Sequence, residues 1–488
     1  MDIEAYRARL AREDAAVQAG GGEARQARQR RLGRLTARER IAALVDEGSF
    51  WELGRHVEHP HADLDPRLAR EQPPGDGLIC GFGTVDGARI AVCAHDPTVF
   101  RGAVGSTGAQ KLRRLLEAAH DRSLPVVTLA DSDGARIPEG VHAMLGWSEV
   151  MAWVVRHRTR APHLTVVPGL CVGAAAYSAA LADLVVMVRD QSFMFLTGPT
   201  VTRTVTGEDV DIEDLGGATL HAEVTGSCHA LVDTEQQAIA WVRAALGYTC
   251  RPQQPSGDDP ARPTPELLRH IPTGRRRAYD AHKVLEAVAD QGSLLELSPR
   301  YAPNLLTALC RLDGRSVALL CSQTLSRAGC LDIDASRKGA AFLAYAQAHG
   351  LPVVTLVDTS GYLPGQQQER GGVLREGARL IRAYAELTVP TVSVTLRKSY
   401  GGASVLSCAS RIRLALPMAE VAPMGAEAAA SVAIGPPKPD GSDRDEHAAF
   451  CDAWRAHHGD AWRAAARGFF DAVIDPAALR AELIRALA

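Results

Sequence analysis

The chain has 488 residues, of which 46% are hydrophobic and 5% aromatic. Cores built mainly from Ala, Val and Leu can therefore form without disulfides or structural metal ions. A formal net charge of −3 excludes a global attraction to nucleic acid or to an anionic membrane. The ten cysteines form no C-x-x-C pair, and no stretch approaches ~18 uncharged apolar residues. These features predict a reduced, soluble, cytoplasmic protein.

The first 45 residues are expected to be helical and basic. Seven arginines between Arg25 and Arg40 favour a solvated helix face, with a phosphate-contacting segment as the alternative. A loop rich in His, Pro and Asp follows between Arg55 and Gly75. Its histidines, His56, His59 and His61, lie on a Pro-broken segment that fixes no tetrahedral geometry, so no metal site is expected.

Strands and helices alternate from about residue 84 onward. The turn signal Asp86-Gly87 predicts a hairpin over Thr84–Val92, and a helix is expected near Gly108–Asp121. Apolar runs predict three further strands, at 125–130, 163–167 and 183–188. Such alternation implies right-handed βαβ crossovers and a mostly parallel sheet, which is an α/β fold.

The second half of the chain repeats the first. Leu124–Gly134 reappears as Leu351–Gly361 at an offset of 227 residues, and Gly173–Ala175 falls on Gly401–Ala403 at an offset of 228. A repeat of this length indicates a duplicated domain, because solenoid units have periods of about 20–50 residues.

The boundaries of the two copies follow from the prolines between them. Five prolines between Cys250 and Pro265 are typical of an interdomain linker. We therefore expect an N-terminal domain over residues 1–250, a linker over 251–275 and a C-terminal domain over 276–488.

Each repeat supplies two turns at which a strand ends and a helix begins. Glycine and alanine there leave backbone N–H groups accessible. Two such turns that converge would form an oxyanion hole for an enolate or carbonyl oxygen. The candidates are Gly134-Ala135 and Gly173-Ala174 in the first repeat, and Gly361-Tyr362 and Gly402-Ala403 in the second. The alternative is that these small residues only allow a helix to pack on a strand.

Motifs for other chemistries are missing from the sequence. It contains no G-x-S-x-G nucleophile elbow, no G-x-x-x-x-G-K-[ST] phosphate loop and no H-E-x-x-H pair. Serine-hydrolase, P-loop and zincin chemistry therefore have no support, and a mechanism that works through backbone N–H groups fits their absence.

Longer motifs follow one another along both halves. Those of the first half are Thr36–Gly54, Asp131–Gly140, Phe195–Pro199, Thr204–Glu208 and Leu215–Ala218. Those of the second half are Tyr301–Asn304, Leu331–Ser336, Gly361–Gly365, Glu369–Gly372, Arg397–Ala403 and Met424–Glu427. From about Thr36 to Leu487 the chain resembles the carboxyltransferase (β) subunits of biotin-dependent acyl-CoA carboxylases of the propionyl-CoA carboxylase type.

The resemblance implies a fold, an assembly and partners. Two crotonase-like (ClpP/crotonase) domains would stand in tandem, and the oligomer would be a trimer of dimers with active sites at the dimer interface. The N-terminal domain of one subunit would hold acyl-CoA, and the C-terminal domain of its neighbour would hold carboxybiotin. A biotin carboxylase and a biotin carrier would be separate partners.

The resemblance also implies roles for individual residues. Gly134-Ala135 and Gly173-Ala174 would contact the acyl thioester, and Ala175 would lie on the substrate side. Gly361, Tyr362, Gly401, Gly402 and Ala403 would surround the ureido oxygen of biotin. Val405, two positions past Ala403, would tune acyl length. Carboxybiotin would release CO2, its enolate would take the α-proton, and the acyl-CoA enolate would attack CO2.

The chain departs from the family pattern at several of these positions. Asp133 stands where the family usually has glycine, Ala174 replaces the second glycine of a Gly-Gly-Ala turn, and Gly105–Gly108 replaces Gly-Glu-Met-His. A carboxylate beside an enolate opposes it electrostatically. Asp133 is expected either to contact a polar or cationic group of an unusual acyl substrate or to point to solvent. Decarboxylation of a malonyl-type thioester, or a non-catalytic paralogue that scaffolds a carboxylase complex, are the alternative functions.

Overall fold

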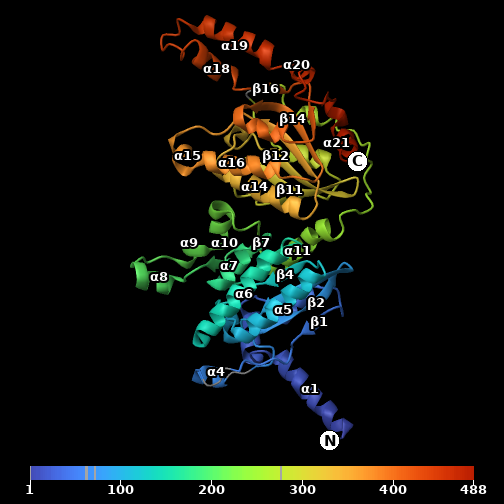
Figure 1. Cartoon of the computed structure of the whole chain (residues 1–488), viewed down its shortest axis with the longest axis vertical. Coiled ribbons are helices and arrows are strands. Elements are labelled where there is room, and N and C mark those ends of the chain that lie inside the picture. Colours follow the sequence, from blue (N-terminus) through green and yellow to red (C-terminus); the bar gives the residue numbers. More distant parts are fainter. Residues whose placement is uncertain (1, 61–63, 71–72, 275–276) are drawn as a thin grey trace. The chain divides into compact units, whose positions relative to one another are not determined.

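The computed structural model describes residues 2–60, 64–70, 73–274 and 277–488. The chain divides into two compact units, residues 1–250 and 251–488, and both are α/β (Figure 1). His61, one of the loop histidines, and Arg275, at the end of the expected linker, lie outside the described residues.

The first unit is built on a seven-stranded sheet in the order β1-β2-β3-β4-β5-β7-β9. Its strands are β1 (Trp51–Leu53), β2 (Leu78–Val85), β3 (Ala88–His95), β4 (Val126–Leu129), β5 (His163–Val167), β7 (Leu184–Val188) and β9 (Ala230–Val232). The first three strands are antiparallel and the rest are parallel. The hairpin and the three strands predicted from the sequence are confirmed.

Helices of the first unit cover this sheet and extend the N-terminus (Figure 1). They are α1 (Ile3–Ala19), α2 (Glu23–Arg31), α3 (Ala37–Leu44), α4 (Pro66–Arg70), α5 (Ser106–Asp121), α6 (Val141–His157), α7 (Ala174–Ala180), α8 (Pro199–Thr206), α9 (Ile212–Gly216), α10 (Ala218–Leu220) and α11 (Glu235–Cys250). A short parallel ladder joins β6 (Leu170–Val172) to β8 (Phe193–Phe195). Apolar residues of α5 and α6, among them Leu115 and Trp147, pack in the core.

The second unit repeats the same plan. Its sheet has the order β10-β11-β12-β13-β14-β15-β17, and β16 pairs with β14. The strands are β10 (Leu295–Leu297), β11 (Leu305–Leu312), β12 (Arg315–Ser322), β13 (Val353–Thr359), β14 (Thr391–Tyr400), β15 (Ile412–Ala415), β16 (Glu420–Ala422) and β17 (Ala472–Val473). The helices are α12 (Leu267–His270), α13 (His282–Val288), α14 (Ile333–Ala348), α15 (Gln366–Gly371), α16 (Val373–Ala385), α17 (Val405–Cys408), α18 (Ala426–Ala433), α19 (Arg444–His458), α20 (Ala461–Ala466) and α21 (Leu479–Leu487).

The Pro-rich segment expected to be a linker is folded against the second unit in its described residues. Leu267 and Ile271 are fully buried in the core of that unit. The Thr264 hydroxyl donates to the Pro476 carbonyl oxygen at 2.8 Å. The segment is therefore not an extended tether. Within the described ranges, no helix is long and apolar enough to cross a membrane.

In each unit a carboxylate ties the hairpin turn to the last helix. In the first unit, Asp46 accepts hydrogen bonds from the N–H groups of Asp86 and Gly87, each at 2.9 Å. The Asp46 carboxylate also lies 3.3 Å from the guanidinium of Arg243 on α11. The Arg243 side chain is 27% exposed, so solvent screens this ion pair.

The second unit buries the equivalent arrangement. Asp290 accepts from the N–H groups of Asp313 and Gly314 at 2.9 and 2.8 Å. Its carboxylate lies 2.6 Å from Arg480 of α21, whose side chain is fully buried. Burial raises the pKa of Asp290, but the hydrogen bonds from Gly314 and Arg480 outweigh it and hold the pKa below its usual range.

We predict that Asp290→Asn destabilises the protein by about 3–5 kcal/mol, because it leaves the buried Arg480 charge without its nearest carboxylate. Denaturant unfolding of the full chain measures this. The stabilisation is present above the unfolded pKa of about 3.9 and is lost as pH falls through the lower folded pKa, so the difference from wild type should shrink in acid. Asp46→Asn, in the more exposed network, is the control and should cost less. Equal losses for the two variants would contradict this account.

Candidate active site

The two strand-end turns of the first unit lie against each other. A Cβ atom at Gly134 would be 2.5 Å from the carbonyl oxygen of Val172 and 3.5 Å from the backbone nitrogen of Ala174. Gly134 has a φ of 86°, a conformation that favours glycine. A side chain at this position would force the two turns apart.

The free N–H groups of these turns belong to the alanines, because those of the glycines are engaged. The N–H of Gly134 donates to the Ser132 hydroxyl at 3.0 Å, and the N–H of Gly173 donates to the Phe195 carbonyl oxygen at 3.0 Å. The N–H groups of Gly134 and Gly173 are therefore engaged within the protein, and the contact of these two residues with a substrate stays a prediction. The N–H groups of Ala135 and Ala174 have no acceptor in the described part of the chain. Ala174 begins α7, where the first N–H groups of a helix lack partners.

The second unit presents the same pair at the equivalent positions. Gly361 donates its N–H to the Thr359 hydroxyl at 3.3 Å. The N–H groups of Tyr362 and Gly402 find no acceptor among the described residues. A Cβ atom at Gly402 would lie 3.6 Å from the Tyr362 ring, which is ordinary contact, so these turns also adjoin. Ala403 beside them is fully buried.

Two residues expected to contact the acyl group follow the turns along the chain and are buried. Ala175 is 2% exposed in α7, and Val405 is 9% exposed at the start of α17. Their part in acyl selection stays a prediction. Gly401, with a φ of 59°, connects the end of β14 to the turn that carries Gly402.

A buried aspartate holds the strand end from which each first turn begins. Asp131 lies 2.9 Å from Arg40, and its other carboxylate oxygen accepts the N–H of Leu170 at 3.2 Å. Arg40 also pairs with Glu235 at 2.7 Å. Sequence reasoning missed Arg40 as part of this network because it lies on α3, far away along the chain.

The equivalent aspartate of the second unit, Asp358, pairs with an arginine from a different element of the fold. Asp358 lies 2.7 Å from Arg397, a residue of β14. Arg397 also donates to the carbonyl oxygens of Pro272, Gly274 and Arg277 at 2.9 to 3.1 Å. The repeat of Asp131 as Asp358 was visible in the sequence, whereas the two arginines occupy unrelated positions.

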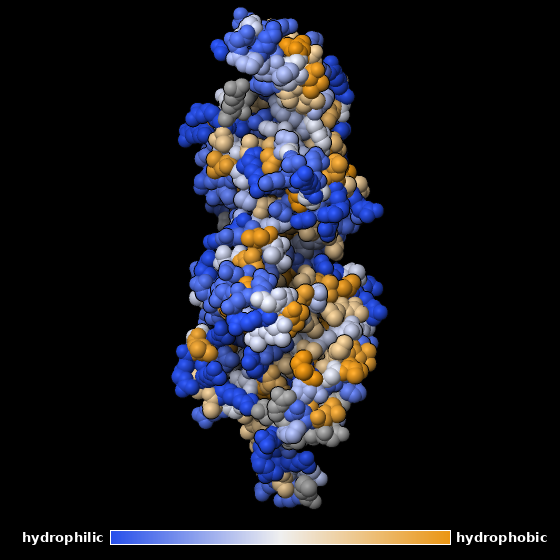
Figure 2. All heavy atoms as spheres, turned by 90° about the vertical axis from the view of Figure 1, so that its left-hand side faces the viewer, coloured by the Kyte–Doolittle hydropathy of each residue, from blue (hydrophilic) through white to orange (hydrophobic). Residues whose placement is uncertain are grey.

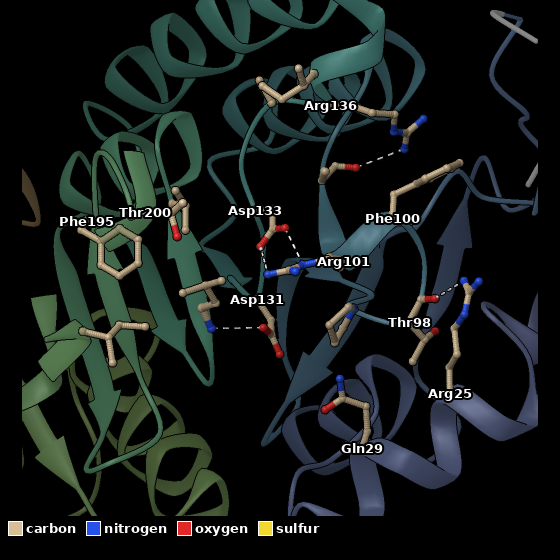
Figure 3. Close-up of a pocket in the computed structure, with 18 of the residues that line it drawn as sticks. Arg25, Gln29, Thr98, Phe100, Arg101, Asp131, Asp133, Arg136, Phe195 and Thr200 are labelled. Carbon is tan, nitrogen blue, oxygen red and sulfur yellow. Dashed lines mark hydrogen bonds and ion pairs between the residues drawn. The ribbon is translucent and has the colours of Figure 1, made fainter. Parts of the chain in front are cut away.

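A cleft of about 1030 Å³ opens beside Ala135 in the first unit (Figure 3). Five arginines are among its lining residues: Arg25, Arg28, Arg34, Arg101 and Arg136. Arg136 is neutralised by Asp76 at 2.6 Å and Glu139 at 3.0 Å. Arg28 and Arg34 have no acidic partner in the described ranges, so they leave positive charge at the cleft.

Asp133 also lines this cleft, and its carboxylate forms an ion pair with Arg101. Its carboxylate lies 2.6 Å from Nε of Arg101, and a second contact joins the same two groups at 3.3 Å (Figure 3). Burial raises the pKa of Asp133, and Arg101 only partly offsets the rise. Arg101 has a φ of 54°, between Phe100 and Gly102 with φ of 46° and 72°, so a strained turn presents it. Asp133 thus neither stands unpaired in the cleft nor points freely to solvent.

The chain is similar over almost its whole length to a family of known proteins. A model of the carboxyl transferase domain matches residues 28–488. The propionyl-CoA carboxylase beta chain of Roseobacter denitrificans is 38% identical over 97% of this chain and 94% of the relative. The propionyl-CoA carboxylase carboxyltransferase subunit of Haloferax mediterranei is 39% identical over 95% of this chain and 92% of the relative.

Two further similarities concern other reactions of carboxylated CoA thioesters. The methylmalonyl-CoA decarboxylase subunit alpha of Veillonella parvula is 38% identical over 97% of this chain and 93% of the relative. The solved hexamer of transcarboxylase 12S, with methylmalonyl-CoA and methylmalonic acid bound, has a TM-score of 0.95 and 36% identity. That similarity covers 100% of this chain and 95% of the solved one.

Proposed function

The chain belongs to the carboxyl transferase domain family, and from this premise we propose that it transfers a carboxyl group between biotin and the α-carbon of an acyl-CoA thioester. One observation of the structure carries the proposal. Each unit presents two N–H groups without acceptors in the described chain, at equivalent positions of the repeat, on adjoining turns. Carboxyl transfer between two enolates needs two such sites, one for each developing oxyanion.

The first unit takes the CoA thioester. The N–H groups of Ala135 and Ala174 would donate to the thioester oxygen and stabilise its enolate. The adjoining cleft is large enough for a cofactor-sized ligand, and the guanidinium groups of Arg28 and Arg34 suit the phosphates of CoA. The basic segment near the N-terminus therefore contributes part of its charge to substrate binding.

The second unit takes biotin. Tyr362 and Gly402 would donate their N–H groups to the ureido oxygen, and the absence of a side chain at Gly402 leaves room for the ring. Carboxybiotin held there would supply the CO2 and, in its ureido oxygen, the base for the α-proton. No side-chain base is then required of this chain, whose residues only bind, orient and stabilise charge.

A complete site requires a second copy of the chain and a separate carrier of biotin. Around the cleft, apolar side chains of Ile137, Val141, Met144 and Leu145 are more than half exposed. Figure 2 shows orange patches of this kind over the first unit. We place the second unit of a neighbouring copy against this surface, in a trimer of dimers. All ten cysteines are free, which supports a reducing, cytoplasmic location.

A second function has a specific observation in its favour. The similarity to the methylmalonyl-CoA decarboxylase subunit alpha is as extensive as that to the propionyl-CoA carboxylase chains. The same N–H pairs would stabilise an enolate formed by loss of CO2 from a malonyl-type thioester.

The experiment that tests the proposal follows a labelled carboxyl group. The full chain is incubated with a panel of carboxyl-labelled malonyl-type CoA thioesters, with and without free biotin, and the products are weighed by mass spectrometry. Transfer that depends on biotin supports the proposal. Equal loss of CO2 with and without biotin indicates a decarboxylase independent of biotin, and no change with any thioester indicates a non-catalytic scaffold.

We predict that Gly402→Val abolishes biotin-dependent transfer and leaves the oligomer intact. The conformation of Gly402 is open to other residues and a Cβ fits against Tyr362, but two further methyl groups would occupy the space of the ureido oxygen. Light scattering measures the oligomer. Gly257→Val is the matched control in the same unit, because nothing lies within 4 Å of a Cβ atom there. Undiminished turnover in the Gly402 variant would remove this turn from the site.

We predict that Asp133→Gly raises kcat/KM for propionyl-CoA by about threefold to tenfold, because a partly screened negative charge is removed from beside the enolate. The same variant should lower activity on the natural substrate if that substrate carries a group that contacts the Asp133–Arg101 pair. Asp133→Asn, which keeps the size and removes the charge, separates electrostatics from shape. Unchanged activity of both variants on both substrates would show that Asp133 acts only on Arg101.

A further inference from the structure

Lysine is rare in this chain. Five of the 54 basic residues are lysines: Lys111, Lys283, Lys338, Lys398 and Lys438. Lys111 and Lys338 are buried equivalents in the repeat, and each donates to backbone carbonyl oxygens. Lys283 pairs with Glu286 at 2.9 Å, and Lys438 lies on an exposed loop. Lys398 is the remaining one, and it lies at the candidate biotin site.

The ammonium group of Lys398 is held at the turn and has no carboxylate within ion-pair distance among the described residues. Its Nζ atom donates to the Ser360 hydroxyl at 3.2 Å, and Ser360 directly precedes Gly361. Its backbone N–H donates to the buried Asp358 carboxylate at 3.3 Å, which fixes the strand beneath it. Burial raises the pKa of the Cys330 thiol, and the nearby Lys398 ammonium opposes that rise.

The internal repeat shows which wall of the second site Lys398 occupies. Leu170 lines the cleft of the first unit, together with Ala103, Asp133 and Ala135. At offsets of 227 or 228 residues, the equivalents of these four residues are Lys398, Cys330, Ser360 and Tyr362. Lys398 therefore places an ammonium where the acyl cleft has an apolar side chain, and the Ser360 hydroxyl that holds it lies two residues before Tyr362.

We propose that the Lys398 ammonium stabilises the negative charge that develops on the ureido oxygen of biotin, beside the N–H groups of Tyr362 and Gly402. The inference rests on the proposed function. When CO2 leaves, the bond between the ureido nitrogen and the carboxyl carbon breaks, and its electron pair passes to the ureido oxygen. That oxygen then accepts the α-proton of the acyl-CoA, so Lys398 neither gains nor loses a proton.

This placement makes the two sites chemically unequal. The thioester enolate would be held by N–H groups alone, whereas the ureido anion would have a full positive charge beside its N–H donors. A charge-assisted contact is about twice as strong as a neutral one.

The test compares Lys398→Met and Lys398→Arg with the control Lys438→Met, using carboxyl transfer from methylmalonyl-CoA to free biotin. For Lys398→Met we expect kcat to fall by about ten- to a hundredfold while KM for biotin changes by less than about threefold, because the charge develops only in the transition state. Lys398→Arg should recover part of kcat. Biotin binding, followed by saturation-transfer NMR without turnover, should be unchanged.

A wild-type kcat in Lys398→Met would overturn the inference and leave the proposed function standing. So would a loss confined to KM, or a loss accompanied by a lower unfolding temperature, because either shows a binding or structural role. Absence of biotin-dependent transfer in the wild-type chain would overturn the proposed function, and this inference with it.

Discussion

The arrangement of both sites depends on a buried aspartate at the end of a parallel strand. Asp131 and Asp358 are almost fully buried, and each is paired with an arginine that is itself at least nine-tenths buried. Charges in such surroundings are stable only when paired and hydrogen-bonded, so removal of one partner would be severe. Each pair fixes the strand end that precedes a turn with a free N–H group. These N–H groups are the part of the fold to which the account assigns the chemistry.

Glycine and the N–H donors have separate tasks in these turns. Gly134 allows the two turns to approach, because any Cβ would meet the Val172 carbonyl oxygen. A hydroxyl two residues earlier, of Ser132 or Thr359, then satisfies the glycine N–H in each unit. The next residue, Ala135 or Tyr362, is left with its N–H free. The position of the N–H donor is thus independent of the side chain that the residue carries. The side chains of the two units can therefore differ to suit different ligands.

Much of the fold could be predicted because the repeat and the apolar runs are local signals. Asp86-Gly87 gave its hairpin, and the runs at 125–130 and 163–167 became β4 and β5. The partners of buried charges could not be predicted, since Arg40 reaches Asp131 only after the chain has folded. The prolines after Cys250 predicted a linker. The segment packs on the second unit instead, because burial of the apolar side chains of Leu267 and Ile271 in the core of that unit stabilises it there. Which N–H of each two-residue turn stays free also depends on tertiary hydrogen bonds.

The central claim is that backbone N–H groups stabilise the transferred charge, and removal of a single N–H tests it most directly. Replacement of Tyr362 by the corresponding α-hydroxy acid converts one amide to an ester and keeps the side chain. The account predicts that kcat for biotin-dependent carboxyl transfer falls by about a hundred- to a thousandfold, the usual effect of one lost oxyanion donor. The same exchange at Tyr384, within α16, serves as the control for the loss of an amide. An ester at residue 362 that retains the wild-type kcat would contradict the account.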